Sequence, residues 1–168
     1  MLCVVNGRTR SSGVDAHCRL DLCTRPKYRG GRLPRVYVFV YGTLTDPERV
    51  DEVLETGTAA FAGAATLEGL HRVDGHYPTL APGGLVEGRL LEVDDHALRR
   101  LDRYEGVDSG LYIRVTVPFE STDGEAAVYV GEPSRLDLED VDWPAGPTFE
   151  SRVRRYVAET GPTLVRDA

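Results

Sequence analysis

A run of six β-branched or aromatic residues at positions 36–41 constrains the fold of this 168-residue chain more than any other feature. Strands with one solvated face alternate apolar and polar residues, so an uninterrupted run predicts a central strand buried on both faces. Gly42 ends the run. Thr45 and Glu48 then have capping-box spacing, which predicts that a helix starts directly afterwards. A sheet covered by other structure on both sides is therefore expected.

The residues that follow alternate between strand and helix patterns. We predict that the first helix ends at Gly57, and that 77–84 is a loop restricted by its prolines. Gly88, inside a strand, predicts a bulge or a close backbone approach. The predicted strands cover 61–73, 85–93, 111–117 and 125–130, and the later helices cover 95–105 and 148–159. The fold class is thus a mixed α/β domain with five or six strands and three helices.

The chain divides into three parts by composition. Residues 1–35 lack helical or alternating periodicity and are interpreted as a disordered N-terminal extension; a basic binding arm, an organellar transit peptide and sequence upstream of the true start are the alternatives. The domain is expected at 36–160, followed by a short tail at 161–168. All three cysteines lie within the first 23 residues, which excludes a disulfide-built domain and a cysteine nucleophile in the main body.

Charge and hydropathy exclude several function classes. The net charge is −7, although residues 1–35 carry eight basic and only two acidic residues. The main body is therefore strongly acidic and would repel phosphate backbones, so no nucleic-acid partner is expected. No apolar run reaches the length of a membrane span or has the layout of a secretory signal. We accordingly expect no membrane association and a cytoplasmic location.

Lys27 is the only lysine in a chain of 27 acidic residues. Many carboxylates combined with almost no lysine indicate a salt-adapted protein, because salt screens repulsion between like charges. We expect the melting temperature to rise with added salt. A melting temperature that does not change with salt concentration would contradict this hypothesis.

Glu105 is a carboxylate on an apolar stripe. It shares one face of the predicted helix 95–105 with Leu98 and Leu101, whereas Asp102 is expected on the opposite, solvated face. A glutamate in that position is paired, lies at a fraying helix end in contact with water, or is kept for chemistry. Apolar surroundings would raise its pKa toward neutrality, the range that a general acid or base needs.

Two further groups of residues could bind a ligand. Tyr41, Gly42, Thr43 and Leu44 join the buried strand to a helix start, where backbone N–H groups favour an anion; an ordinary strand-to-helix connection is the alternative. Tyr112 and Arg114 share a strand face and could hold a carboxylate or orient Glu105, or simply face solvent. The histidines show no metal-ligand spacing. The sequence also lacks a Gly-x-Ser-x-Gly nucleophile elbow.

Taken in order, these segments resemble the gamma-glutamylcyclotransferase-like family, most closely its short gamma-glutamylamine cyclotransferase type. The resemblance covers residues 36–160 and rests on spaced motifs. They are Tyr-Gly-Thr-Leu at 41–44, Tyr-Pro-Thr-Leu at 77–80, Val-Glu-Gly-Arg-Leu at 86–90, Leu-Asp-x-x-Glu-Gly at 101–106 and Tyr-x-Arg at 112–114.

The resemblance implies a small β-barrel with flanking helices and a reaction on a γ-glutamyl amine or γ-glutamyl amino acid. The substrate's own α-amine attacks its γ-carbonyl, which gives 5-oxoproline and a free amine. Glu105 would be the catalytic acid and base, and residues 41–44 would hold the glutamyl group or the oxyanion. A small-molecule substrate is implied, with no metal, organic cofactor or particular oligomeric state. A γ-glutamyl deprotecting enzyme of a biosynthetic pathway and a non-catalytic binding protein of the same fold are the alternatives.

Overall fold

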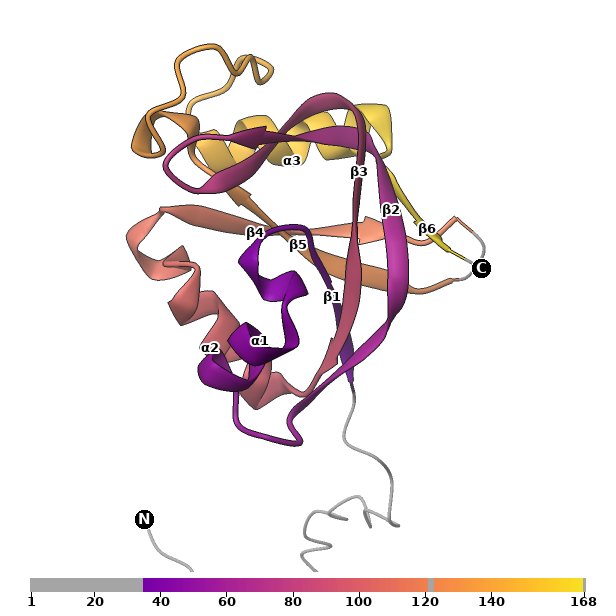
Figure 1. The fold of residues 1–168 in the computed structure, drawn as a ribbon. Helices are drawn as coiled ribbons and strands as arrows, with labels where there is room; N and C mark the ends of the chain where they lie inside the picture. The colour runs from indigo at the N-terminus through magenta and orange to yellow at the C-terminus, as the bar shows by residue number, and fades with distance from the viewer. Residues whose placement is uncertain (1–34, 121–122, 168) are drawn as a thin grey trace, which may run out of the picture. The chain divides into compact units, whose positions relative to one another are not determined.

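A curled six-stranded sheet organises the residues that the computed structural model describes, 35–120 and 123–167 (Figure 1). The strands are β1 (Val36–Val40), β2 (Ala59–Asp74), β3 (Pro78–Val93), β4 (Tyr112–Pro118), β5 (Glu125–Gly131) and β6 (Thr163–Arg166). The helices are α1 (Pro47–Val53), α2 (Asp95–Tyr104) and α3 (Phe149–Thr160), with 3-10 turns at Thr43–Thr45, Val107–Ser109 and Pro133–Arg135.

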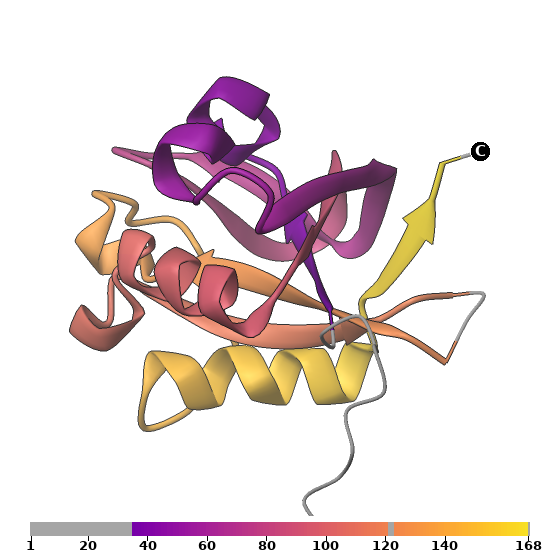
Figure 2. The same cartoon turned by 90° about the horizontal axis from the view of Figure 1, so that it is seen from below.

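The strand order is β4-β5-β1-β3-β2-β6, and only the β1–β5 pair is parallel. The long hairpin of β2 and β3 bends at two register shifts. Phe119, just after β4, forms a bridge with Leu164 of β6, so the two ends of the sheet approach each other. The sheet thus curls into a half-barrel, and Figure 2 shows α3 on a different side of it from α1. This confirms the predicted α/β fold class.

Strand β1 is buried on both faces, as its composition predicts. Phe39 lies in the core inside the curled sheet, together with Leu67, Leu90 and residues of α3. Val38 and Val40 point the other way, into a second core that α1 and α2 cover. Because β1 separates the two cores, its end at Val40 is held from both sides. The loop that follows therefore starts from a fixed point.

The predicted loop at 77–84 is wrong, because β3 already begins at Pro78. Proline cannot donate to a strand ladder, but it is tolerated at the first residue of a strand and beside a bulge. Pro78 is the first residue, and Pro82 pairs with Leu70 directly at a register shift. Only residues 75–77 connect the two strands.

Three predicted boundaries also differ. The N-cap of α1 is Asp46, whose carboxylate accepts a hydrogen bond from the Glu48 N–H; the Thr45 hydroxyl instead donates to the Gly42 carbonyl. The first helix ends at Val53, before Gly57. Beyond residue 160, where a short tail was expected, Thr163–Arg166 adds strand β6 to the sheet. The predicted N-terminal extension falls almost entirely outside the described residues.

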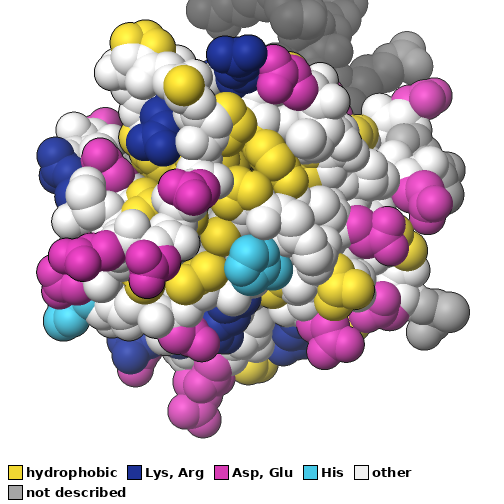
Figure 3. All heavy atoms as spheres, turned by 90° about the horizontal axis from the view of Figure 1, so that it is seen from above, with side chains coloured by type: hydrophobic (Ala, Val, Ile, Leu, Met, Phe, Trp, Pro, Cys, Tyr) yellow, Lys and Arg dark blue, Asp and Glu magenta, His cyan; other side chains and the backbone are white. Residues whose placement is uncertain are grey.

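The surface in Figure 3 carries acidic side chains across the face, with apolar side chains gathered between them. Repulsion between such carboxylates is the interaction that added salt would screen, as the salt-adaptation hypothesis requires. Among the described residues, no helix combines the length and the apolar composition that crossing a bilayer requires.

Gly88 lies where β3 passes very close to β1. A Cβ atom added at Gly88 would clash with the carbonyl oxygen of Val40 and with the ring of Phe39. We expect Gly88→Ala to lower the free energy of unfolding by about 1–3 kcal/mol, the usual cost of overpacking a core. Urea unfolding measures this. Glu87→Ala, at the exposed neighbouring position, is the control, and an equal loss in both variants would contradict the close-approach explanation.

Candidate active site

Glu105 lies at the point where α2 ends. The Asp94 carboxylate caps the start of this helix by accepting a hydrogen bond from the Ala97 N–H at 2.8 Å. The Glu105 N–H still donates to the Leu101 carbonyl oxygen at 2.8 Å. Gly106 then adopts a left-handed conformation with φ of 67°, which turns the chain away from the helix. The backbone of Glu105 is therefore fixed on both sides.

A cavity of about 240 Å³ lies beside this helix end. Its walls come from the end of β1, the start of β3, the end of α2 and the strands β4 and β5. Six of the seven predicted site residues line it, namely Tyr41, Gly42, Thr43, Leu44, Glu105 and Tyr112. The volume is below that of pockets for drug-sized ligands, and it suits a small molecule.

The environment of the Glu105 carboxylate favours its neutral form. Burial raises the pKa of Glu105 to about 7. No described residue donates a hydrogen bond to this carboxylate, and no described cation forms an ion pair with it. A carboxyl group with a pKa near 7 exchanges its proton readily at neutral pH, so it can act as base and then as acid.

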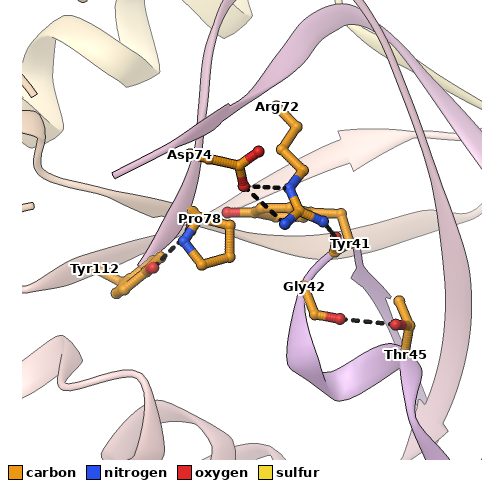
Figure 4. A network of polar contacts seen from close by, with 7 residues as sticks. All are labelled: Tyr41, Gly42, Thr45, Arg72, Asp74, Pro78 and Tyr112. Atoms are coloured by element: carbon orange, nitrogen blue, oxygen red, sulfur yellow. Dashed lines mark hydrogen bonds and ion pairs between the residues drawn. The ribbon is translucent and has the colours of Figure 1, made fainter. Parts of the chain in front are cut away.

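The carbonyl groups of the loop after β1 are held by other residues (Figure 4). The guanidinium of Arg72, itself paired with Asp74 at 2.7 Å, donates to the Tyr41 carbonyl oxygen at 3.0 Å. The Gly42 carbonyl accepts hydrogen bonds from the hydroxyl of Thr45 at 2.7 Å and from its N–H at 3.1 Å. These bonds fix the orientation of successive peptide groups.

The N–H groups of the same loop are left without partners. No described residue accepts a hydrogen bond from the N–H of Gly42, Thr43 or Leu44. Unpaired backbone N–H groups next to a cavity are suited to bind a carboxylate or an oxyanion. The loop thus offers unpaired donors, and Glu105 offers a carboxyl group whose pKa is about 7.

The tyrosines of the cavity wall are hydrogen-bonded to the backbone of neighbouring strands. The hydroxyl of Tyr112 donates to the Pro78 carbonyl oxygen at 2.7 Å, and that of Tyr41 donates to the Tyr129 carbonyl oxygen at 2.7 Å. Burial, followed by the nearby charge of Glu105, raises the pKa of Tyr112. The pKa of Tyr41 is likewise raised, chiefly by burial, so both phenols stay protonated and act as fixed walls of the cavity.

Arg114, the seventh predicted residue, does not line the cavity. Its guanidinium contacts both carboxylate oxygens of Asp102, at 2.7 and 2.9 Å. Asp102 also accepts a hydrogen bond from the Tyr129 hydroxyl at 2.7 Å, so the expectation that it lies on a solvated face is wrong. Helix α2 packs against β4 and β5. The Arg114–Asp102 ion pair holds the Tyr129 hydroxyl through Asp102.

Removal of Arg114 should destabilise the protein, because it leaves the half-buried Asp102 carboxylate without a cation. We expect Arg114→Ala to lower the free energy of unfolding by about 1–3 kcal/mol, the cost of a lost charged hydrogen bond. Arg155→Ala is the matched control. It breaks an ion pair whose two side chains are more than half exposed, and such pairs contribute about 0.2–1 kcal/mol. Equal losses in urea unfolding would show that the Asp102 contact is unimportant.

Sequence reasoning missed several residues of the site. Tyr77, Pro78, Tyr104 and Tyr129 also line the cavity, and Arg72 orients its loop. Tyr77, Pro78 and Tyr104 stand inside or beside recognised motifs, so their positions carried a signal. Tyr129 carried none, because only the pairing of β5 with β1 brings it to the cavity.

Candidate metal ligands do not gather in the described part of the chain. Nowhere in residues 35–120 and 123–167 do three His, Cys, Asp or Glu side chains come together in an arrangement able to hold a metal ion. The cavity lining accordingly offers Glu105 as its single carboxylate.

Comparisons with known proteins agree with this architecture. The model of the family "Gamma-glutamyl cyclotransferase, AIG2-like" matches residues 38–145. The curated protein AIG2 A of Arabidopsis thaliana is 37% identical over 92 residues, which is 51% of this chain and 51% of the relative. The alignment thus spans about half the length of that curated relative.

Two solved structures show the same fold. A gamma-glutamyl cyclotransferase superposes with a TM-score of 0.51 at 21% identity, over 76% of this chain and 81% of that one. A solution structure from Arabidopsis thaliana is 28% identical, with a TM-score of 0.50 over 79% of this chain and 89% of the other.

Proposed function

The chain belongs to the AIG2-like gamma-glutamyl cyclotransferase family, and from this premise we propose that it converts a γ-glutamyl amide to 5-oxoproline and a free amine. The observation that carries the proposal is a half-buried carboxyl group, Glu105, with a pKa of about 7 and no described hydrogen-bond donor, in a cavity beside unpaired N–H groups. Such an arrangement is suited to proton transfer next to a developing negative charge.

The proposed reaction needs no nucleophile from the protein. The α-nitrogen of the substrate attacks its own γ-carbonyl carbon, forming the new C–N bond of a five-membered ring. Glu105, as carboxylate, takes the proton that the attacking nitrogen loses. It then returns that proton to the leaving nitrogen as the old C–N bond breaks. The carboxyl group ends as it began, and the atoms balance without water or a cofactor.

The remaining contribution of the protein is positioning. Ring closure is intramolecular, and correct orientation can lower its barrier by about 7–11 kcal/mol. In this proposal the N–H groups of Gly42, Thr43 and Leu44 bind the substrate's α-carboxylate or its developing oxyanion. The hydrogen bonds of Arg72 and Thr45 to the loop carbonyls keep these donors available.

The proposal is tested by measuring 5-oxoproline release from a panel of γ-glutamyl amides, at high salt, with the Glu105→Gln variant as control. Release that depends on Glu105 is the expected result. If the folded protein releases 5-oxoproline from none of the amides, or if the variant releases it equally well, the proposal is wrong.

A further inference from the structure

Two exposed tyrosines stand at the cavity that holds Glu105. Tyr77 lies in the short connection between β2 and β3, and Tyr104 is the last residue of α2. Both line the cavity, although 52% and 44% of their surfaces are exposed. Only one other large apolar residue in the described ranges is comparably exposed, Leu85, which is not part of this cavity. Exposed apolar side chains gathered at a cavity are typical of a binding surface.

The backbone around Tyr77 is held firmly, while its side chain is not. The preceding His76 N–H donates to the Leu136 carbonyl oxygen at 3.0 Å, and the following Pro78 carbonyl accepts the Tyr112 hydroxyl at 2.7 Å. Among the described aromatic rings, only that of His76 contacts the Tyr77 ring, in an edge-to-face arrangement with 4.6 Å between centroids. Its hydroxyl has no hydrogen-bond partner among the described residues. The ring is therefore positioned but has a free face.

Tyr104 is placed directly beside the acid. It precedes Glu105 in the chain, and no described aromatic ring packs against it. Tyr77, Tyr104 and Tyr112 all belong to the lining of the same cavity. The two rim tyrosines, Tyr77 and Tyr104, thus border the same cavity as Tyr112.

The charges of the cavity restrict what this rim can bind. Glu105 is its only carboxylate, and no Arg, Lys or His lines it. A leaving group with a carboxylate next to its nitrogen would find no cation there. A cationic leaving group would find only Glu105, which has to exchange its proton during the reaction. An uncharged ring, in contrast, can pack against the two tyrosines.

We propose that the rim tyrosines form the leaving-group subsite and select γ-glutamyl amides of alkylamines that carry an uncharged aromatic ring over γ-glutamyl amino acids. This inference rests on the proposed function, because it assigns the place of the departing amine in that reaction. Tyr77 and Tyr104 are specificity residues in this scheme, and Glu105 remains the group that moves the proton.

Three substrates test the proposal with matched differences. γ-Glutamyl phenethylamide carries a ring, γ-glutamyl ethylamide lacks it, and γ-glutamyl phenylalanine equals the first with one added carboxylate. We expect kcat/KM for the phenethylamide to exceed that for each of the other two substrates by about three- to tenfold. This factor corresponds to the free energy of one or two aromatic contacts. The three amides have leaving groups of the same alkylamine type, so leaving-group chemistry does not dominate the comparison.

Variants assign the preference to the two rings. In Tyr77→Ala and Tyr104→Ala the ratio of kcat/KM for phenethylamide over ethylamide should fall toward one, whereas Tyr77→Phe and Tyr104→Phe should keep it. Leu85→Ala removes an equally exposed side chain away from the cavity and should keep the wild-type ratio. A preference for the ring that survives both alanine variants would overturn the proposal, as would equal or better use of γ-glutamyl phenylalanine.

The two proposals fail in different ways. Turnover of all three compounds without a ring preference overturns the leaving-group subsite and leaves the cyclotransferase reaction standing. No turnover of any compound overturns the reaction itself. In that case, calorimetric binding of the phenethylamide to Glu105→Gln no tighter than that of the ethylamide would also overturn the subsite, and tighter binding that needs both tyrosines would support it.

Discussion

Replacement of Glu105 by glutamine is expected to lower the rate of 5-oxoproline release by about 10²- to 10⁴-fold, the contribution of one positioned acid or base. The amide has nearly the same shape as the carboxyl group but cannot accept and return a proton. Substrate binding should persist, since the N–H groups of residues 42–44 and the tyrosine walls are unchanged.

The measurement is single-turnover formation of 5-oxoproline, with calorimetry to confirm that the variant still binds the substrate. Glu68→Gln is a matched control, because Glu68 is an exposed glutamate of β2. A Glu105→Gln variant that retains more than about a tenth of the wild-type rate would show that another group moves the proton, since general acid–base catalysis contributes more than that.

The same substitution should stabilise the protein at alkaline pH. Burial raises the pKa of Glu105 in the folded state to about 7, from an ordinary value of 4.5. Between pH 4.5 and about pH 7 the Glu105 carboxyl group keeps its proton in the folded protein but loses it in the unfolded chain. The free energy of unfolding therefore falls as pH rises through this range. The difference between the two pKa values corresponds to a loss of stability of about 3 kcal/mol at most. Glutamine stays neutral at every pH, so the Glu105→Gln variant does not lose this stability as pH rises.

Urea unfolding at two pH values measures this effect. We expect the stability gain of Glu105→Gln over wild type to be about 2 kcal/mol larger at pH 8 than at pH 5. Glu68→Gln should show no such pH dependence. A gain that is the same at both pH values would mean that the Glu105 carboxyl group titrates in its ordinary range and is not shielded from water.

Local patterns in the sequence predicted the elements that carry the chemistry. The apolar run at 36–41 identified the central strand, because only a strand between two cores needs two apolar faces. The position of Glu105 on the stripe of Leu101 singled it out but left contact with water at the helix end as an alternative, and its assignment as the acid came from the resemblance to the family.

Other features depend on contacts between distant parts of the chain. Asp102 and Arg114 are 12 positions apart and pair across an α2–β4 contact that helical periodicity does not reveal. The Tyr41 hydroxyl reaches the Tyr129 carbonyl, 88 positions away, only because β1 and β5 are neighbours. The β-strand at Pro78 was missed for a different reason. Proline lacks a backbone N–H group, so it predicts a loop unless no hydrogen-bond donor is needed at its position, and this depends on the partner strand.

The three-residue connection 75–77 between β2 and β3 has a consequence for how such proteins diversify. Glu105 is anchored at the end of α2 and by the turn at Gly106, whereas Tyr77 is carried by a separate turn at the tip of a hairpin. In the proposed reaction, substitutions in that turn would change which amine departs and would leave the residues proposed for ring closure intact. A lineage with this architecture can therefore acquire new substrates by exchanging one hairpin tip.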